Sequence, residues 1–351
     1  MRGGGGWSGR IRQTRIVYPG YVPFLVFLMG KVTIIGATGN VGRYTALAVS
    51  YIPYVSELLL FGRPGREEVL HGLAYDLHDS FAARGNQADV KFSCIPKDLE
   101  GGSDIVIVTS GVPRKEGQDR IDLAHENARM ISEVAAMVGW YAPNAILFIV
   151  SNPVDVMTAV ALKYSGMKPN KVIGLGTHLD SMRLKWNLAK YFDVHVSEVH
   201  TRIIGEHGES MVPLWSATTV GGISIRNLPE FEDFPKDKIM YNVMNAGSAI
   251  ISRIGATVYG PGDAIATIVR TILGNEKRIL TVSAFISSEI HNIGDVCIGI
   301  PPARLDKNGA TPLAITISET EVEGGFRESV EKVRSVTQEV IEQLDESCHG
   351  R

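Results

Sequence analysis

The chain has 351 residues, of which 44% are hydrophobic, 21% charged and 7% aromatic, so it can hold one large domain or two ordinary ones. The net charge is -3, from 35 basic and 38 acidic residues. It shows no excess of positive charge that would indicate binding to nucleic acid or to an anionic membrane surface. Three widely separated cysteines, Cys94, Cys297 and Cys348, fit neither a disulfide framework nor a CxxC-type metal site. No apolar run reaches the roughly 18 residues of a membrane-spanning helix. We therefore expect a cytoplasmic α/β protein.

Residues 1–28 differ in composition from the rest of the chain. They contain four arginines, no acidic residue and four consecutive glycines before an apolar stretch at residues 21–28. A secretory signal has a similar order, but Pro19 and Pro23 interrupt the apolar stretch and no small-residue cleavage site follows. We expect Met29 to be the true start and residues 1–28 to be a mis-called extension. A disordered natural tail is the alternative.

From Met29 onward, short apolar runs alternate with longer segments of helical period. The apolar runs predict strands buried on both faces at residues 32–35, 58–61, 90–92, 105–108, 146–150 and 172–173. The segments between them predict helices over residues 41–51, 67–83, 120–141 and 154–164. Six strands separated by helices predict an α/β fold with a Rossmann-type, doubly wound parallel sheet and right-handed crossovers.

After about Thr177 the alternation loosens, which predicts a second unit of the α+β class. We expect a helix over residues 180–191, strand pairs near residues 200–204 and 223–225, a Gly-rich helix near residues 243–273 and a hairpin-like stretch over residues 283–317. One apolar face predicts a C-terminal helix over residues 326–344. That face consists of Phe326, Val330, Val333, Val336, Val340 and Leu344.

A glycine-rich turn connects the first predicted strand to the first predicted helix. Gly36, Gly39 and Gly42 have separate roles in such a turn: a tight bend, close approach of the backbone to a pyrophosphate, and close packing of helix on strand. The helix start adds free N–H groups and the positive end of its dipole. The first spacing is GxxG rather than the commoner GxG. We therefore predict a dinucleotide-binding domain over residues 29–174 and a catalytic, substrate-binding domain over residues 175–345.

Polar residues follow the predicted strands at the edge of the sheet where ligands bind. Arg114 and Arg120 lie six apart in a loop with Gly and Pro after the fourth strand, which suggests a mobile lid. Asn152 follows the fifth strand. Taken alone, the two arginines would more often be solvated loop charges.

Three further residues form a second group. Asp180 and Arg183 are three apart, so they share one face of the helix that begins there. His207 lies between glycines at the end of a strand. Alone, the first two would be an ordinary helix ion pair and His207 a structural histidine.

In this order and spacing, the motifs GATGNVG, TSGVPRKEGQDR, SNPVD, LDSMR and IGEHGES resemble the malate/lactate dehydrogenase family, and within it the archaeal NAD(P)-dependent malate dehydrogenases. The resemblance covers residues 29–344. It implies His207 as proton donor and acceptor, with Asp180 as its orienting partner. It also implies Arg183 as the substrate-carboxylate ligand, Arg120 as the group that polarises the reacting C–O bond, and Arg114 as the reader of the substrate's far end. Asn152 would contact substrate and cofactor.

The chemistry requires these residue types independently of the resemblance. Reduction of a 2-oxo acid needs a proton delivered to the carbonyl oxygen, which a histidine does near neutral pH. An ionised Asp180 beside His207 favours the imidazolium. Arg183 can grip a carboxylate with a bidentate fork. Oxaloacetate has two carboxylates and a carbonyl, so we expect it to be preferred over pyruvate, with Arg114 on the far carboxylate and Lys115 as the alternative reader.

The cofactor is expected to be NADP or NAD. NAD-specific sites place an acid about 20 residues beyond the glycines. Gly62 occupies that position and Arg63 follows it, so we predict that NADP(H) is accepted and even preferred. The alternative is that Arg63 and Arg66 are plain loop charges. The full set of expected cofactor-binding positions is Gly36, Thr38, Gly39, Asn40, Val41, Gly42, Gly62, Arg63, Ser110, Gly111, Asn127, Val150 and Asn152.

Several alternatives stay open from the sequence. The nearest is L-lactate dehydrogenase or another 2-hydroxy acid dehydrogenase of the same family. An NAD- and metal-dependent glycosidase would need metal ligands, which Cys94 and Cys297 do not supply because they lie outside every motif. A nucleotide sensor would not need a proton relay. We expect no metal, no nucleic acid and no membrane partner, His178 to lie beside the cofactor site without being catalytic, and a homodimer or homotetramer whose subunit number stays open.

Overall fold

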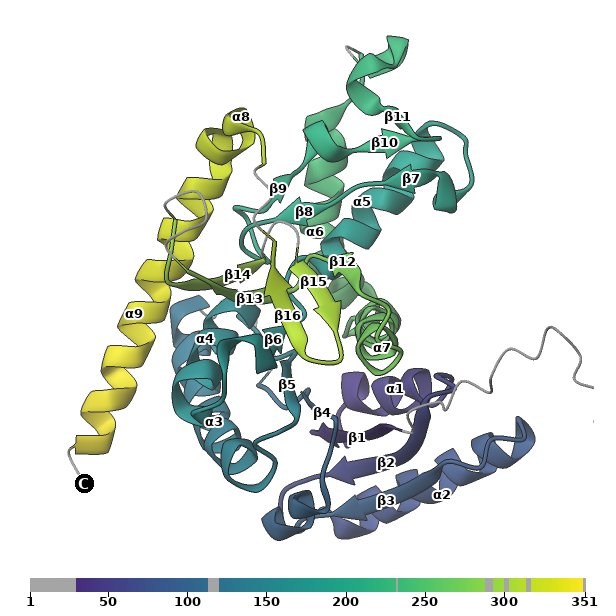
Figure 1. The fold of residues 1–351 in the computed structure, drawn as a ribbon, viewed down its shortest axis with the longest axis vertical. Helices are drawn as coiled ribbons and strands as arrows, with labels where there is room; N and C mark the ends of the chain where they lie inside the picture. The colour runs from purple at the N-terminus through teal and green to yellow at the C-terminus, as the bar shows by residue number, and fades with distance from the viewer. Residues whose placement is uncertain are drawn as a thin grey trace, which may run out of the picture.

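The computed structural model describes residues 30–112, 120–231, 233–287, 293–299, 303–313 and 317–349 (Figure 1). Its largest element is a sheet of eight strands in the order β14-β13-β6-β5-β4-β1-β2-β3. The strands from the first half of the chain are β1 (Gly30–Ile35), β2 (Val55–Phe61), β3 (Asp89–Ser93), β4 (Ile105–Val108), β5 (Ile146–Ile149) and β6 (Val172–Gly174). They pair in parallel. The predicted doubly wound sheet is confirmed.

Each central strand is apolar on both faces, because helices cover the sheet on both sides. Successive residues of β4 alternate between two core clusters: Ile105 and Ile107 belong to one, and Val106 and Val108 to the other. Parallel strands need a crossover between them, and the chain supplies helices for it: α1 (Asn40–Val49), α2 (Glu67–Ala83), α3 (Arg120–Tyr141) and α4 (Val154–Ser165).

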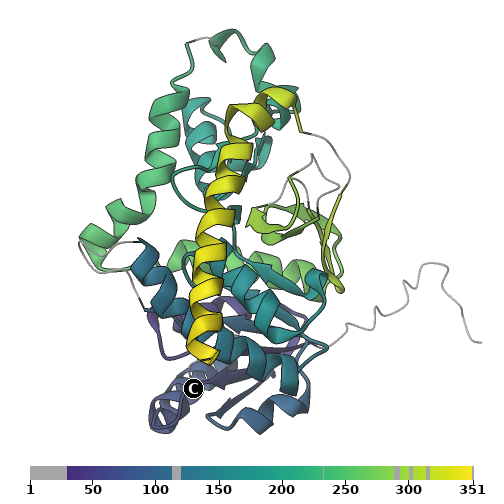
Figure 2. The same cartoon turned by 90° about the vertical axis from the view of Figure 1, so that its left-hand side faces the viewer.

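The helices divide between the two faces of the sheet. The first cluster includes residues of α1, α2 and α7 (Tyr259–Leu273), and the second includes most of the buried residues of α3 and α4. The last helix, α9 (Arg327–His349), contributes to both: Val330 and Val333 belong to the first cluster, and Val340 and Leu344 to the second. Figures 1 and 2 show α9 running along the length of the molecule beside α3 and α4. The predicted apolar face of α9 is confirmed, since Phe326, Val330, Val333, Val340 and Leu344 are buried, with Val336 partly buried against them.

The rest of the second half forms a third core cluster around α5 (His178–Tyr191) and α6 (Lys236–Ile254). Short strands surround it: β7 (Val199–His200), β8 (Ile203–Ile204), β9 (Val212–Pro213), β10 (Thr219–Val220) and β11 (Ile223–Ser224). A separate three-stranded sheet contains β12 (Arg278–Leu280), β15 (Ala303–Asp306) and β16 (Gly309–Pro312). A short helix, α8 (Glu319–Glu321), and a π-helical turn (Val322–Phe326) precede α9.

Two predictions for the second half were wrong. The single helix expected near residues 243–273 is two helices, because Gly255 takes a left-handed φ of 84° and ends α6. The stretch expected as one hairpin is divided between two sheets. Strand β13 (Ser283–Ile286) joins the large sheet antiparallel to β6, and β14 (Val296–Gly299) pairs antiparallel with β13. Strand β15 instead pairs with β12 on one side and β16 on the other.

Close packing of α1 on α7 depends on a small residue. A Cβ at Gly262 would lie 2.2 Å from a ring carbon of Tyr44, so only glycine lets the ring rest against α7. The Tyr44 hydroxyl also donates to Asp263 at 3.1 Å. In the ranges that the structure covers, no helix combines the length and apolar character needed to cross a bilayer.

Candidate active site

The glycine turn lies between β1 and α1, at the point where the strand order reverses. Gly36 has a φ of 88°, and a Cβ there would lie 2.6 Å from the Ser110 backbone nitrogen. A Cβ at Gly42 would lie 2.3 Å from the Gly36 carbonyl oxygen, so α1 presses directly on the turn. Gly39 caps α1 without any side-chain hydrogen bond, and the first turn of α1 holds no acid. The turn therefore leaves a tight backbone cradle and helix N–H groups that fit a pyrophosphate.

Gly62 and Arg63 follow β2 at the same edge. Gly62 is buried and its N–H donates to the Ser93 carbonyl at 3.1 Å, which fixes the loop against β3. Arg63 and Arg66 are both exposed, and neither forms an ion pair with any residue that the structure describes. The loop thus presents two positive charges and no acid at the predicted ribose position.

The loops after β4 and β5 are held together by one amide. Asn127 of α3 is buried; its Oδ1 accepts from the Val112 N–H at 2.8 Å and its Nδ2 donates to the Asn152 carbonyl at 2.8 Å. The Ser151 hydroxyl donates to the Ser110 carbonyl. Asn127 therefore orients the two loops with its whole amide, which leaves Asn152 exposed at the edge.

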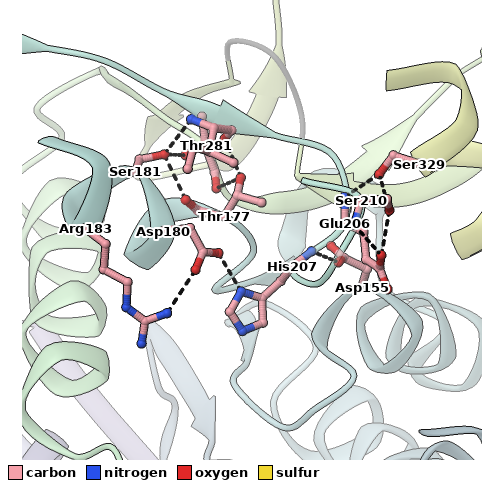
Figure 3. Close-up of polar contacts among 11 residues, drawn as sticks. Asp155, Thr177, Asp180, Ser181, Arg183, Glu206, His207, Ser210, Thr281 and Ser329 are labelled. Atoms are coloured by element: carbon pink, nitrogen blue, oxygen red, sulfur yellow. Dashed lines mark hydrogen bonds and ion pairs between the residues drawn. The ribbon is translucent and has the colours of Figure 1, made fainter. Parts of the chain in front are cut away.

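Asp180, Arg183 and His207 meet as a connected chain of contacts (Figure 3). The Asp180 carboxylate is fully buried; it accepts from Arg183 at 3.1 Å and lies 2.6 Å from Nδ1 of His207. The His207 side chain is 26% exposed, so part of the ring faces outward. This arrangement leaves Nε2 as the ring nitrogen that can exchange a proton with a ligand.

The charges of the three residues reinforce one another. Burial alone would raise the pKa of Asp180, but the charge and hydrogen bond of His207, together with Arg183, hold that pKa below its usual value. The negative charge of Asp180 in turn raises the pKa of His207, although burial opposes the rise. An imidazolium is therefore favoured at this position.

The loop that carries His207 is fixed from two further sides. Gly205 exchanges both backbone hydrogen bonds with Gly299 at the end of β14, at 2.9 and 3.1 Å. The His207 N–H donates to Asp155 of α4 at 2.8 Å. Glu206 accepts from Lys332 of α9 at 2.9 Å, which ties the loop to the C-terminal helix.

Residues 30–174 match the family described as lactate/malate dehydrogenase, NAD binding domain. Residues 177–344 match its alpha/beta C-terminal domain. This chain belongs to the lactate/malate dehydrogenase family.

Individual members of the family are similar over most of the chain. A malate dehydrogenase from Methanothermobacter marburgensis is 47% identical over 324 residues, which is 90% of this chain and 98% of the relative. An L-2-hydroxycarboxylate dehydrogenase (NAD(P)(+)) from Methanocaldococcus jannaschii is 44% identical over 312 residues, which is 88% of this chain and 99% of the relative. Solved structures are similar as well. One such structure is a lactate dehydrogenase from a Medee basin deep-sea metagenome library, with a TM-score of 0.80 and 34% identity, covering 89% of this chain and 98% of that one.

Some of the predicted site lies outside the described residues. Arg114 and Lys115 fall in the segment 113–119, and Arg120 begins α3 with its side chain also outside the description. Their predicted roles are therefore untested by geometry. Within the part of the chain that is described, no group of three or more His, Cys, Asp or Glu residues could hold a metal ion.

His178 begins α5 and is buried. Burial, assisted by the charge of Arg278, lowers its pKa to about 4. The imidazole of His178 is therefore neutral near pH 7 and is not an imidazolium that could serve as a general acid, which separates it from His207.

The sequence assigned no role to two acids at the loop that carries His207. Asp155 and Glu206 both lie inside the family motifs. Glu206 directly precedes His207, but nothing in the spacing shows that Asp155 reaches the same loop. The available signal was position: Asp155 is in the first turn of the helix that starts at the ligand-binding edge of the sheet.

Proposed function

We propose that this chain is a malate dehydrogenase, which catalyses reversible hydride transfer between NAD(P)H and oxaloacetate to give (S)-malate. The observation that carries the proposal is the Arg183–Asp180–His207 chain of contacts in a member of this family. L-Lactate dehydrogenase, or another 2-hydroxy acid dehydrogenase of the family, is the second candidate, because the similar proteins include both activities by name.

A bound nicotinamide dinucleotide supplies the hydride. The cradle formed by Gly36, Gly39 and Gly42 and the start of α1 would hold its pyrophosphate. His207 donates its Nε2 proton to the carbonyl oxygen during reduction and takes that proton back during oxidation. Asp180 keeps the ring oriented and stabilises the charged form, as a buried carboxylate on the opposite nitrogen does.

Three arginines would balance the negative charges of the substrate and of the oxygen at its reacting carbon. Arg183 grips the carboxylate next to the reacting carbon with a planar fork, while Arg120 polarises the C–O bond. Arg114 pairs with the second carboxylate of oxaloacetate. Pyruvate places a methyl group there instead and leaves a charge unpaired, which costs about 1–3 kcal/mol or more and gives at least tenfold discrimination.

Steady-state reduction of oxaloacetate and pyruvate tests both the activity and this assignment. His207→Asn should lose about 100- to 10,000-fold in kcat/KM. Arg114→Gln should reduce the preference for oxaloacetate, whereas Lys115→Gln should leave it unchanged. A wild-type protein that reduces pyruvate better than oxaloacetate would establish the second candidate instead.

We also propose that NADP(H) is accepted and preferred. The support is the exposed Arg63 without an ion-pair partner among the described residues, and Gly62 where an acid would repel a 2′-phosphate. A well-placed guanidinium contributes about 1.5–3 kcal/mol to binding that phosphate, which is roughly ten- to a hundredfold in affinity.

The cofactor ratio of kcat/KM decides this point in wild type, Gly62→Asp, Arg63→Ala and Arg66→Ala. A Cβ at Gly62 would lie 3.0 Å from Cδ1 of the buried Leu70, so an aspartate requires that side chain to shift by a few tenths of an ångström, and circular dichroism should establish that Gly62→Asp is folded. We expect Gly62→Asp and Arg63→Ala to shift use toward NADH, with Arg66→Ala changing it less. Wild-type use of NADH at least tenfold better than NADPH would contradict the proposal.

We propose further that the chain forms a homodimer or homotetramer, with one interface on the face around α2, α6 and the start of α7. A groove of about 1000 Å³ runs between α1, α2 and the α6–α7 connection, and its lining includes the exposed side chains of Ile254 and Tyr259. Tyr75 of α2 and Tyr241 and Ile251 of α6 are exposed as well. Exposed apolar surface next to a groove is typical of interaction sites.

Sedimentation equilibrium tests the dimer. Ile254→Glu should lower the apparent mass toward that of one chain, whereas Trp140→Glu, an exposed apolar position on α3, should not. Equal masses for wild type and both variants would contradict this interface. A mass of four chains would indicate a second interface in addition.

The remaining proposals concern the cell and the division of the chain. We propose a cytoplasmic location, supported by Cys94 and Cys297, which are buried free thiols. We also propose a dinucleotide-binding domain over residues 29–174 and a catalytic domain over residues 175–345, with residues 1–28 as a separate segment.

A further inference from the structure

His207 lies between two buried carboxylates that approach it from opposite sides (Figure 3). Asp180 of α5 contacts the ring at Nδ1, 2.6 Å away. Asp155 of α4 accepts a hydrogen bond from the backbone N–H of the same residue at 2.8 Å. Asp155 is only 3% exposed, and it reaches the loop from the part of the chain that precedes β6.

The surroundings of Asp155 offer little to stabilise a charge. Its other oxygen, Oδ1, has no hydrogen-bond partner among the described residues. The groups that face it are the Cys297 thiol from β14, the Ser283 hydroxyl from β13 and the Glu206 carboxylate, whose partners include Lys332 and Ser210. Burial raises the pKa of Asp155 to about 6, and the polar groups of Ser283 and His207 oppose the rise.

A neutral residue would satisfy the backbone of His207 equally well. An asparagine or a backbone carbonyl accepts one N–H without the cost of burying a carboxylate. Asp155 adds a negative charge next to a residue that must hold a proton. That charge acts on His207 in the same direction as Asp180, and against Arg183.

We propose that Asp155 is a second positioning residue of the proton relay, which fixes the main chain of His207 and helps, by its negative charge, to keep the imidazole protonated. This inference rests on the proposed role of His207 as the proton donor. Above about pH 6 the carboxylate is ionised and supports the imidazolium; below that pH it takes up a proton and the support is withdrawn.

The test compares Asp155→Asn with a matched variant, Asp306→Asn. Asp306 is also buried and also accepts a backbone N–H at 2.8 Å, from Asn308, but it lies in the β15–β16 hairpin. The titration of the His207 ring is followed by NMR in the protein without substrate, with His207→Asn identifying its signal. We expect Asp155→Asn to lower the titration midpoint of His207 by about one pH unit and Asp306→Asn to leave it unchanged.

The kinetic readout should follow the titration. In Asp155→Asn the fall of kcat/KM for oxaloacetate reduction at high pH should begin at lower pH, by the same shift. A purely structural role would lower kcat at every pH without moving the profile. An unchanged His207 midpoint in folded Asp155→Asn would overturn the inference.

Wild type alone provides a second check if Asp155→Asn does not fold. The carboxyl carbon of Asp155 should titrate near pH 6, and a midpoint above pH 8 would also overturn the inference, since no charge would then be present near neutrality. A failure of the proposed function would give another result. His207→Asn would then retain activity, whatever midpoint the His207 ring shows in the wild-type protein.

Discussion

Asp180 is the residue on which the relay depends most directly, and Asp180→Asn removes its charge with little change in shape. The carboxylate makes two charge-assisted contacts, 2.6 Å to His207 and 3.1 Å to Arg183. Each such contact contributes about 1.5–3 kcal/mol. An asparagine keeps one oxygen that can accept a hydrogen bond. Its NH2 group would face either His207 or Arg183, each of which needs an acceptor there.

If both contacts act in the transition state, the loss is about 3–6 kcal/mol. At about 1.4 kcal/mol for each power of ten, kcat/KM for oxaloacetate should fall by roughly two to four powers of ten. The assay is steady-state reduction of oxaloacetate by purified protein, with far-ultraviolet circular dichroism to establish that the variant is folded.

Ser181 provides a matched control because it is the next residue but serves the scaffold. Its hydroxyl accepts from the Ile203 N–H at 2.9 Å and donates to the Thr177 carbonyl at 2.8 Å. Ser181→Ala should cost about 1–3 kcal/mol of unfolding free energy, since a buried N–H loses its partner, yet retain most of the activity. Our reasoning would be refuted if Asp180→Asn kept more than a tenth of wild-type kcat/KM, or if Ser181→Ala lost as much.

Three other predictions use different features of the molecule. Because Asp180 raises the pKa of His207, kcat/KM for reduction should decline as pH rises through that pKa while kcat/KM for malate oxidation rises, and parallel profiles would contradict the relay. Gly42→Ala should weaken dinucleotide binding at least tenfold by fluorescence titration, since its Cβ would lie 2.3 Å from the Gly36 carbonyl; Gly72→Ala, with open space around it, should bind normally. Phe326→Ala, which empties a buried site, should lower the unfolding free energy in urea by about 3–5 kcal/mol, and a loss below about 1 kcal/mol would show that the site collapses.

The parallel half of the fold could be predicted because its signals are local. Each strand is a short apolar run, and glycines mark the first turn, where side chains at Gly36 and Gly42 would collide with backbone. The second half was harder because its strands are two to four residues long and pair across distance. The addition of β13 to the edge of β6 depends on such a pairing, between Ser283 and Gly174, which no local pattern encodes.

The contacts of the candidate site are likewise of two kinds, those that local spacing predicts and those that only the folded chain brings together. Asp180 and Arg183 are three apart on one helix, so their contact follows from sequence spacing. The contact of His207 with Asp180 spans 27 positions and that with Asp155 spans 52, and both require the folded chain. The motif resemblance supplied the first of these contacts, whereas the second became visible only in the structure.

The extension of the large sheet by β13 and β14 has a mechanical consequence. Both strands belong to the second half of the chain, yet they close the β6 edge, and α4 and α9 pack across the seam. A fragment ending at residue 174 would leave the backbone groups of β6 open to edge-to-edge pairing, which favours aggregation. A hinge motion between the two halves of the chain would break the hydrogen bonds between β6 and β13. We therefore expect the loops at the carboxyl edge of the sheet, rather than a domain rotation, to admit the substrate.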